Sequence, residues 1–231
     1  MIKLENKRLM ACAELMEQDG STRRCAADIG TDHGYLAAYL VQSGICERAV
    51  AADINEMPLE SAKRTIAEQG LKGRVTPLLS DGLDSVPRGD ITHIICAGMG
   101  GELIADIISR CEWARECTLI LQPMTKPDEL REWLYDHGFE VVRELARRDG
   151  RFVYSVMRVR FSEGGLPYPK DEMYIYSGAI DPDEEDGAEY IRIAAKRLKR
   201  AGEGILSSDS GSQEGRRRLE AAGKLLARIG G

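Results

Sequence analysis

The chain has 231 residues, of which 43% are hydrophobic and 30% are charged. This size suits one well-buried α/β core with a small accessory element, and the composition excludes collagen-like and strongly disordered classes. No apolar run approaches the roughly 18 residues of a membrane-spanning helix, and the N-terminal segment lacks the apolar stretch of a secretory signal, so we expect a cytoplasmic protein without a membrane partner. The formal charge of −6 does not attract nucleic acid to the protein as a whole, so an RNA partner would need a local basic patch.

The elements begin with an N-terminal segment that we interpret as a surface helix. Between about residues 25 and 160, short apolar runs alternate with amphipathic stretches, which predicts a parallel sheet covered by helices. Strands are expected at residues 24–29, 49–54, 75–79, 91–97, 118–122, 139–146 and 151–161. The last two are joined by Arg148-Asp149-Gly150, and Asp-Gly between two strands favours a hairpin. The sheet should therefore end in an antiparallel pair.

The helix that precedes this hairpin has clear boundaries in the sequence. We expect Thr125 to cap it, Pro127 to lie in its first turn and Gly138 to end it. Residues 162–167 are typical of a linker, so we divide the chain into a domain at 1–161 and a linker with helical appendage at 162–231. The appendage should contain two helices separated by a polar break at 207–211, which form either an antiparallel hairpin or a pair packed on the sheet domain.

Cysteine usage gives further information about the class of protein. None of the six cysteines belongs to a C-x-x-C pair, and several lie in apolar, strand-like runs: Cys12, Cys25, Cys46, Cys96, Cys111 and Cys117. They are predicted to be reduced core residues, which is typical of the cytosol. This usage argues against a disulfide framework and against a structural zinc site, and we expect no metal.

The most informative segment is a strand that ends in a glycine-bearing turn and leads into a helix, Asp28-Ile29-Gly30-Thr31-Asp32-His33-Gly34-Tyr35. Gly30 allows the backbone to approach a ligand closely, and the start of the next helix offers free N–H groups. The G-x-G-x-x-G spacing of a dinucleotide site is absent, which disfavours a nicotinamide oxidoreductase. His33 is interpreted as a hydrogen-bonding partner, and His93 and His137 as structural residues.

Three further loops follow the next strands. Asp53 ends the second strand, where an acid suits a ribose diol, and Asp81-Gly82 follow the third, where they could border an adenine ring. The fourth strand ends in the segment 97–101, Ala-Gly-Met-Gly-Gly. Taken singly, Asp28 could be an ordinary helix cap and the glycine run a tight turn. Together the four loops leave the carboxyl ends of parallel strands, where open α/β sheets bind ligands.

These motifs resemble those of the bacterial tRNA (adenine(22)-N1)-methyltransferase family. The resemblance rests, in chain order, on the turn at 28–35, the loop at 97–101, and Leu121-Gln122-Pro123 followed by Leu-Arg-Glu-Trp-Leu at 130–134; it extends from about Leu4 to Phe161 and includes Lys7-Arg8-Leu9. It implies a Rossmann-like class I methyltransferase fold, S-adenosylmethionine as cofactor, and methylation of N1 of an adenine in the D-arm region of tRNA.

The resemblance also implies a set of site residues. Those expected to bind the cofactor are Asp28, Gly30, Thr31, Asp32, His33, Tyr35, Asp53, Ile54, Asp81, Gly82, Ala97, Gly98 and Met99. Those expected to face the substrate are Gly100, Gly101, Gln122 and Pro123. The candidate catalytic carboxylates are Asp32 and Asp81, either of which could stabilise charge on the methylated base or take a proton from N6. Asp32 departs from the second glycine of many methyltransferases, and the 97–101 loop lacks the base-stacking aromatic of the Asn-Pro-Pro-Tyr signature.

Basic residues near these loops are the expected RNA contacts: Lys7, Arg8, Arg147, Arg148 and Arg151. If the strand before the hairpin runs parallel to the first five, the hairpin tip lies at the edge of the cofactor loops. The alternatives are a methyltransferase acting on a small molecule, a protein or another RNA, and a non-catalytic module that binds S-adenosylmethionine or RNA. The sequence leaves the oligomeric state open, with a monomer slightly favoured.

Overall fold

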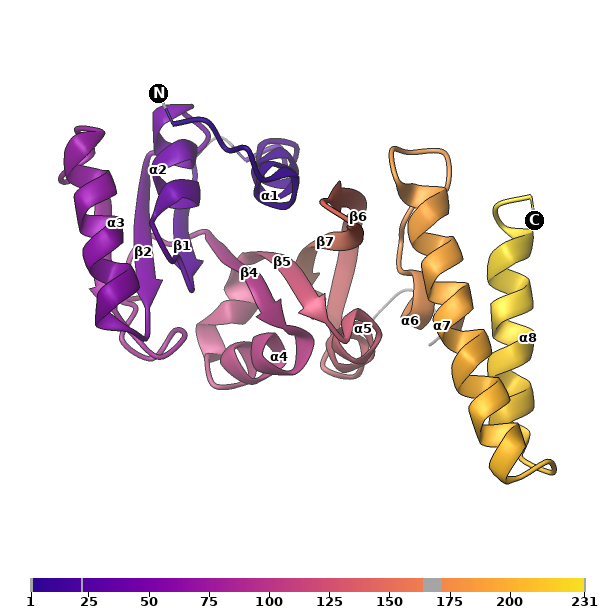
Figure 1. Ribbon diagram of the computed structural model, residues 1–231. Coiled ribbons are helices and arrows are strands. Elements are labelled where there is room, and N and C mark those ends of the chain that lie inside the picture. Colours follow the sequence, from indigo (N-terminus) through magenta and orange to yellow (C-terminus); the bar gives the residue numbers. More distant parts are fainter. Residues whose placement is uncertain (1, 22, 164–171, 231) are drawn as a thin grey trace.

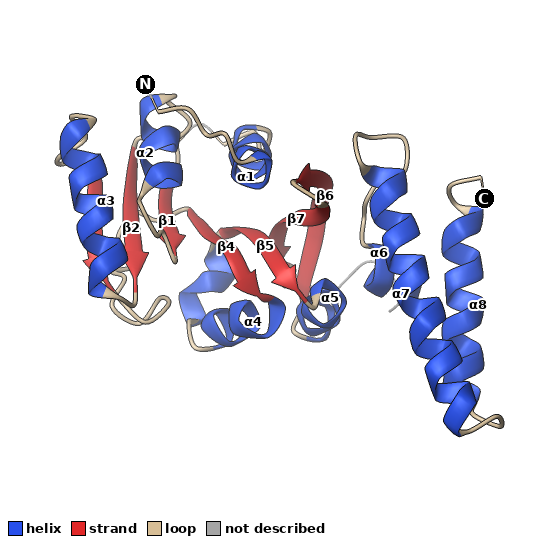
Figure 2. Cartoon of the chain, in the orientation of Figure 1, coloured by secondary structure: helices blue, strands red, loops and turns tan. Residues whose placement is uncertain are grey.

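The protein is described by a computed structural model covering residues 2–21, 23–163 and 172–230. Within these residues seven strands form one sheet in the order β3-β2-β1-β4-β5-β7-β6. Figures 1 and 2 show this sheet, with all strands except β3 labelled. The strands are β1 Cys25–Ile29, β2 Arg48–Asp53, β3 Val75–Leu79, β4 His93–Gly100, β5 Thr118–Thr125, β6 Phe139–Asp149 and β7 Phe152–Phe161. All seven predicted strands are confirmed, and so is the α/β class.

Helices cover both faces of the sheet. They are α1 Lys7–Glu17, α2 Tyr35–Gln42, α3 Glu56–Glu68, α4 Gly101–Ser109, the 3-10 helix η1 Glu112–Glu116, α5 Pro127–Asp136, α6 Glu172–Ser177, α7 Gly187–Ser208 and α8 Gln213–Ala227. Apolar side chains of α1, α2 and α3 form the core on one face, and those of α4, η1 and α5 form the core on the other. All six cysteines are free and buried, as predicted.

Two expectations about helices are wrong in detail. The N-terminal helix α1 is not a surface helix, because Cys12, Leu15 and Met16 are fully buried in the core that it shares with the sheet. Thr125 does not cap α5, because β5 continues through it and Lys126 takes the N-cap position in a left-handed conformation, without a side-chain cap bond. The bulged pairing of β4 with β5 extends both strands beyond their predicted ends.

The sheet ends in the predicted hairpin. Because β7 is antiparallel to both β5 and β6, β6 runs in the same direction as the first five strands. The turn between Asp149 and Phe152 therefore lies at the edge of the sheet where β1, β2, β3, β4 and β5 also end. Gly150 has a φ of +58° there, which glycine adopts without strain.

The helices α7 and α8 form an antiparallel hairpin that projects from the sheet domain, on the right in Figure 1. This is the first of the two predicted arrangements. The helices approach closely where Gly202 faces Gly215: a Cβ on Gly202 would lie 2.8 Å from the Gly215 carbonyl oxygen. Along the rest of the contact, apolar side chains of the two helices pack into a small core that includes Ile191, Leu198 and Leu225. Residues 164–167 of the expected linker at 162–167 lie outside the described residues, and the domain boundary stays a prediction.

A fully buried ion pair of the sheet domain also contacts the helical hairpin through its arginine. Arg131 of α5 donates to the carboxylate of Glu144 on β6 at 2.6 Å, and both side chains are inaccessible to solvent. The same guanidinium donates to the Ile175 carbonyl at 3.0 Å and to the Tyr190 hydroxyl at 2.7 Å. Four elements, α5, β6, α6 and α7, thus meet at one charged group, which we call the Arg131 cluster.

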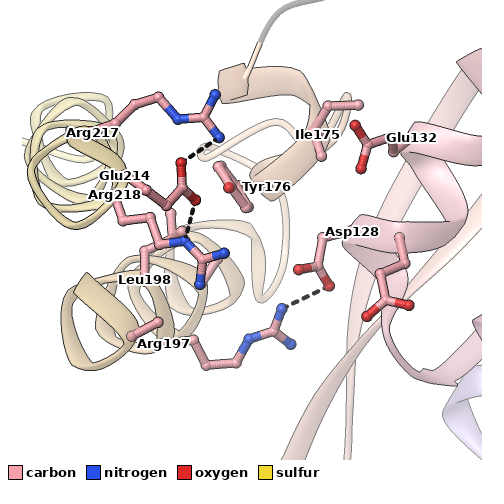
Figure 3. A pocket seen from close by; sticks show the side chains of 12 residues that line it. Asp128, Glu132, Ile175, Tyr176, Arg197, Leu198, Glu214, Arg217 and Arg218 are labelled. Atoms are coloured by element: carbon pink, nitrogen blue, oxygen red, sulfur yellow. Dashed lines mark hydrogen bonds and ion pairs between the residues drawn. The ribbon is translucent and has the colours of Figure 1, made fainter. Parts of the chain in front are cut away.

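An open groove of about 670 Å³ lies between α5 and the helical hairpin, next to the Arg131 cluster. Figure 3 shows Asp128 and Glu132 on the α5 wall and Arg197 and Arg218 on the hairpin wall. An ion pair of 3.0 Å between Arg197 and Asp128 crosses the groove. The groove contains none of the predicted site residues.

Candidate functional site

The turn after β1 is held in one conformation by its backbone. Gly30 and Asp32 have φ angles of +69° and +54°. The N–H groups of Gly30 and Thr31 both donate to the Ala52 carbonyl, at 2.9 and 3.0 Å, which fixes the turn beside the end of β2. A Cβ at Gly30 would overlap the terminal methyl of Met99, so the first glycine of the motif lets the β4 loop pack on this turn.

Asp28 supports this turn from beneath. Its carboxylate is buried and accepts a hydrogen bond from the Thr31 hydroxyl at 2.6 Å. Burial raises the pKa of Asp28 to about 6, although bonds from the Thr31 hydroxyl and the Ala37 N–H oppose that shift. These hydrogen bonds stabilise the turn, which is the kind of structural role that the helix-cap alternative gives Asp28.

Asp53 lies at the end of β2 with its carboxylate nearly buried. One oxygen accepts from the Asn55 N–H at 2.9 Å, and the other accepts from the Asp32 N–H at 3.3 Å. A carboxylate offers about four acceptor positions, so two remain for the hydroxyls of a ribose diol. Ile54, which is 58% exposed, and Leu79, which is 46% exposed, provide apolar surface on the neighbouring strand ends. Such surface suits one face of a purine ring.

Asp81 and Gly82 begin the loop after β3. Gly82 has a φ of +55°, and its carbonyl accepts from the buried Ser80 hydroxyl at 2.9 Å. The carboxylate of Asp81 is paired with the Arg110 guanidinium at 3.2 Å, and Arg110 also contacts Asp84 and Asp106. Asp81 therefore shares a single arginine with two other carboxylates.

The loop at the end of β4 is irregular. Its register against β5 shifts at Met99 and again at Gly100, and Gly98 has a φ of +82°. Gly101 packs against the start of α5, since a Cβ there would lie 2.5 Å from the Lys126 carbonyl oxygen. Ala97 immediately precedes the irregular part and pairs with Gln122 on β5. The predicted substrate-facing residues are thus brought together by the two neighbouring strands.

Gln122 connects this loop to α1. Its side chain is fully buried, and its Oε1 accepts from the Gly98 N–H at 3.0 Å and from Arg8 Nη1 at 2.8 Å. Its Nε2 donates to the Pro123 carbonyl at 3.0 Å. Arg8 also donates through Nε to Asp149 at 2.7 Å and lies over the Tyr154 ring, 5.1 Å from its centroid. These contacts place Arg8 among the site loops.

Asp32, His33 and Tyr35 form the exposed rim of the turn. The carboxylate of Asp32 is 71% exposed and lies 3.6 Å from His33 Nε2, and the His33 and Tyr35 rings stack with centroids 5.3 Å apart. Within the described residues, no lysine or arginine pairs with Asp32. His93, in contrast, is buried against Asp19 at 2.6 Å, which agrees with its predicted structural role. His137 stacks on Trp133 at the end of α5, away from these loops.

The predicted basic contacts differ in how much of their charge is available. Arg147 pairs with Glu14 at 2.9 Å, and Arg148 pairs with Asp186 at 3.6 Å. Lys7 is exposed and lies 3.3 Å from Glu185. Arg151 is exposed at the hairpin tip and stacks on the Phe152 ring, and it forms no ion pair with the described residues.

Sequence reasoning missed several residues of this edge. Leu79 was interpreted only as the last residue of an apolar strand. It is exposed because it lies at the strand end. Arg110, Asp149 and Tyr154 come from distant segments, and no local pattern links them to the motifs. Only composition indicates the basic surface of the helical hairpin. Between positions 187 and 228 there are ten lysines and arginines and five acidic residues.

Within the described residues, no helix is long and apolar enough to cross a membrane. In the same residues, no group of three or more His, Cys, Asp or Glu side chains could hold a metal ion.

Comparison with known families gives one match that covers most of the sheet domain. Residues 5–157 match the family described as "Methyltransferase domain". Among curated proteins, the tRNA (adenine(22)-N(1))-methyltransferase of Bacillus subtilis is 34% identical over 154 residues. That alignment covers 66% of this chain and 63% of the relative, so this chain spans slightly less than two thirds of the relative's length.

Solved structures are similar over almost the whole chain. A Streptococcus pneumoniae protein described as "a putative tRNA (m1A22) methyltransferase" superimposes with a TM-score of 0.81 and 28% identity, covering 96% of this chain and 100% of that chain. The same protein in complex with S-adenosyl-L-methionine superimposes with a TM-score of 0.77 and 28% identity, covering 98% and 100%. The likeness therefore includes the helical hairpin as well as the sheet.

Proposed function

This chain belongs to the methyltransferase-domain family, and from that premise we propose that it transfers a methyl group from S-adenosylmethionine to N1 of an adenine, position 22, in tRNA. The observation that carries the proposal is the grouping of Gly30, Asp53 and the 97–101 loop at one edge of the sheet. The similarity to the B. subtilis and S. pneumoniae proteins supports the substrate and the cofactor. We place the reaction in the cytoplasm.

The residues at this edge fit the chemistry of the cofactor. In the proposal, the two free acceptor positions of Asp53 bind the ribose hydroxyls, and Ile54 with the Asp81-Gly82 backbone borders the adenine. The rest of the proposed cofactor site is lined by the turn from Gly30 to Tyr35 and by Ala97, Gly98 and Met99. Asp28 and Thr31 stabilise this turn through the hydrogen bond between them.

The reaction itself needs placement more than a strong base. S-adenosylmethionine supplies, when bound, a methyl group attached to a positively charged sulfur. Adenine N1 carries a lone pair, so the N1–methyl bond forms as the methyl–sulfur bond breaks, and the positive charge passes to the base. Correct placement of two bound reactants accounts for roughly 7–11 kcal/mol of barrier reduction. The protein's task is to align N1 with the methyl group.

Of the two candidate carboxylates, Asp32 is better suited to respond to charge on the base. Its carboxylate is 71% exposed on the turn and forms no ion pair with a described lysine or arginine, whereas the Asp81 carboxylate is held by Arg110 at 3.2 Å. We assign Asp32 the role of stabilising the cationic product or accepting a proton from N6, and Asp81 a place at the cofactor's adenine. Gly100, Gly101, Gln122 and Pro123 then form the side that faces the substrate.

The acidic chain can bind a polyanion because its charge is unevenly distributed. The whole chain has 32 basic and 38 acidic residues, whereas residues 187–228 have ten and five. Lys196, Arg200 and Arg216 are exposed on the hairpin and form no ion pair with the described residues. We propose that these three contact tRNA phosphates together with Lys7 and Arg151. For Arg8, Arg147 and Arg148, a phosphate contact would require partly buried ion pairs to open, whereas the pair of Lys7 with Glu185 is exposed on both sides.

Methyl transfer to tRNA transcripts tests the proposed reaction. Labelled methyl groups should enter a transcript with adenine at position 22 and should be recovered as 1-methyladenosine after digestion to nucleosides. A matched transcript with guanosine at that position should remain unlabelled. Equal labelling of both transcripts would contradict the assignment of the target base.

Binding as a function of salt concentration tests the RNA surface. The variant K196E/R200E/R216E should weaken tRNA binding and reduce the slope of log K against log salt by about 2–3, because each phosphate contact contributes about 0.9. A control variant, K63E/R64E/K72E, changes the same charge on and near α3, at the other end of the sheet. Equal losses in both variants would show that only the overall charge matters.

A further inference from the structure

Arg8 is nearly surrounded by protein, although it lies on the first turn of a helix. The N–H groups of Arg8 and Leu9 donate to the Asn6 cap at 2.9 and 3.3 Å, which fixes the start of α1. From there the guanidinium reaches two elements through different nitrogens, Asp149 at 2.7 Å and Gln122 at 2.8 Å. Only 16% of its side chain is exposed.

The contact with Gln122 extends to the substrate-facing loop. An amide oxygen has two acceptor positions, and those of Gln122 are taken by Arg8 and by the Gly98 N–H. The Gln122 amide nitrogen is in turn bound to the Pro123 carbonyl at 3.0 Å. The orientation of this buried amide is therefore set from both sides, and with it the position of the peptide before Gly98.

The charge of Arg8 is balanced at the same place. Asp149 accepts from Nε at 2.7 Å, and the Tyr154 ring covers the guanidinium. A neutralised arginine adds little repulsion toward a base that becomes cationic during methylation, whereas an unpaired one beside the loop would oppose it. The planar fork reaches Asp149 through Nε and Gln122 through Nη1, a geometry that the single nitrogen of a lysine does not reproduce.

We propose that Arg8 is a positioning residue for the substrate-facing loop, acting through Gln122 on Gly98, and not a contact to RNA phosphates. This inference rests on the proposed methyl transfer for its catalytic consequence. It predicts that Arg8 affects the rate of the chemical step at saturating tRNA and leaves the affinity for tRNA nearly unchanged.

A double-mutant cycle in kcat tests this connection. R8A and Q122A should each lower kcat at least tenfold, and the double variant should be no more than about twofold worse than the poorer single variant, because both remove the same link. R8K keeps the charge but loses the fork, and it should also lower kcat. The matched controls R23A and R23K change an exposed arginine outside the site and should leave kcat unchanged.

The rival role has a different signature. If Arg8 contacts a phosphate, R8A should raise KM for tRNA and reduce the slope of log K against log salt by about 1. The fold-losses of activity in R8A and Q122A should then multiply in the double variant. R8K should behave nearly as wild type. That result would overturn the proposal. Should R8A fail to fold, R8K and Q122A with the R8K/Q122A double variant complete the same cycle.

A measurement without RNA separates this inference from the proposed function. Hydrogen exchange at the Gly98 amide should accelerate in R8K and Q122A and should stay unchanged in R23K. Inactivity of the wild-type protein on tRNA would count against the proposed function alone, whereas unchanged exchange at Gly98 in R8K would overturn the role of Arg8.

Discussion

Replacing Arg131 by methionine should destabilise the protein by about 3–5 kcal/mol, the range for removing one partner of a buried ion pair. Methionine is of similar length but carries no charge, so the Glu144 carboxylate would stay buried without its cation. Among the described residues, the Ala179 N–H would still donate to it at 3.0 Å. The carbonyl of Ile175 and the hydroxyl of Tyr190 would also lose their shared partner.

Urea unfolding at pH 7 measures this loss. The control E220Q removes one partner of an exposed pair, Lys224–Glu220, and should change the unfolding free energy by less than about 1 kcal/mol. The double variant R131M/E144L removes both charges and should recover much of the loss, because an apolar pair leaves no uncompensated ion. A loss below about 1 kcal/mol in R131M would refute the view that this cluster fastens the hairpin to the sheet domain.

Three further variants test the turn after β1 and the end of β2. Asp53→Ala should weaken S-adenosylmethionine binding by about 1–3 kcal/mol in calorimetry, the cost of leaving buried hydroxyls without their acceptor, and unchanged affinity would remove Asp53 from the site. Gly30→Ala should destabilise the protein by about 1–3 kcal/mol, because the backbone there has a φ of +69° and the new methyl group would displace Met99. The control Gly44→Ala has a φ of +77° but open space around its Cβ, so it should show the cost of the backbone conformation alone. Burial raises the pKa of Asp28 to about 6, so the stability present below pH 4 is lost as the pH rises through 6. Asp28→Asn should abolish that loss, so that the free energy of unfolding of the variant relative to wild type rises by up to about 3 kcal/mol between pH 4 and pH 7. Equal pH profiles of the two proteins in urea unfolding would contradict this expectation.

The strands could be predicted because their information is local. Each of the first five is a short apolar run followed by turn residues, and the Asp149-Gly150 pair marked the hairpin. The motifs then predicted which strand ends meet, because parallel strands place their carboxyl ends at one edge. The resemblance to the tRNA (adenine(22)-N1)-methyltransferases is confirmed by the relatives. Thr125 was misjudged since a bulged pairing with β4, which no local pattern encodes, continues the strand through it.

The roles of individual charged residues could not be predicted in this way. Arg131 stands within a charged stretch of α5 that a sequence pattern assigns to solvent, yet it is fully buried. Its burial depends on Tyr190, 59 positions away, and on the carbonyls of α6. Arg8 was grouped with exposed basic residues, although its partners lie 114 and 141 positions further along the chain. Composition and spacing carry no information about such contacts.

Each of these two arginines joins segments that lie far apart in the chain. A buried guanidinium is costly unless several acceptors surround it, and here the acceptors come from different elements in each case. Arg8 is satisfied only when α1, β5 and the β6–β7 hairpin are together, and Arg131 only when α5, β6, α6 and α7 are together. Partial assemblies leave a charge unpaired, which disfavours them relative to the complete one. The sheet edge that carries the proposed cofactor site and the basic hairpin are therefore expected to keep a fixed relation.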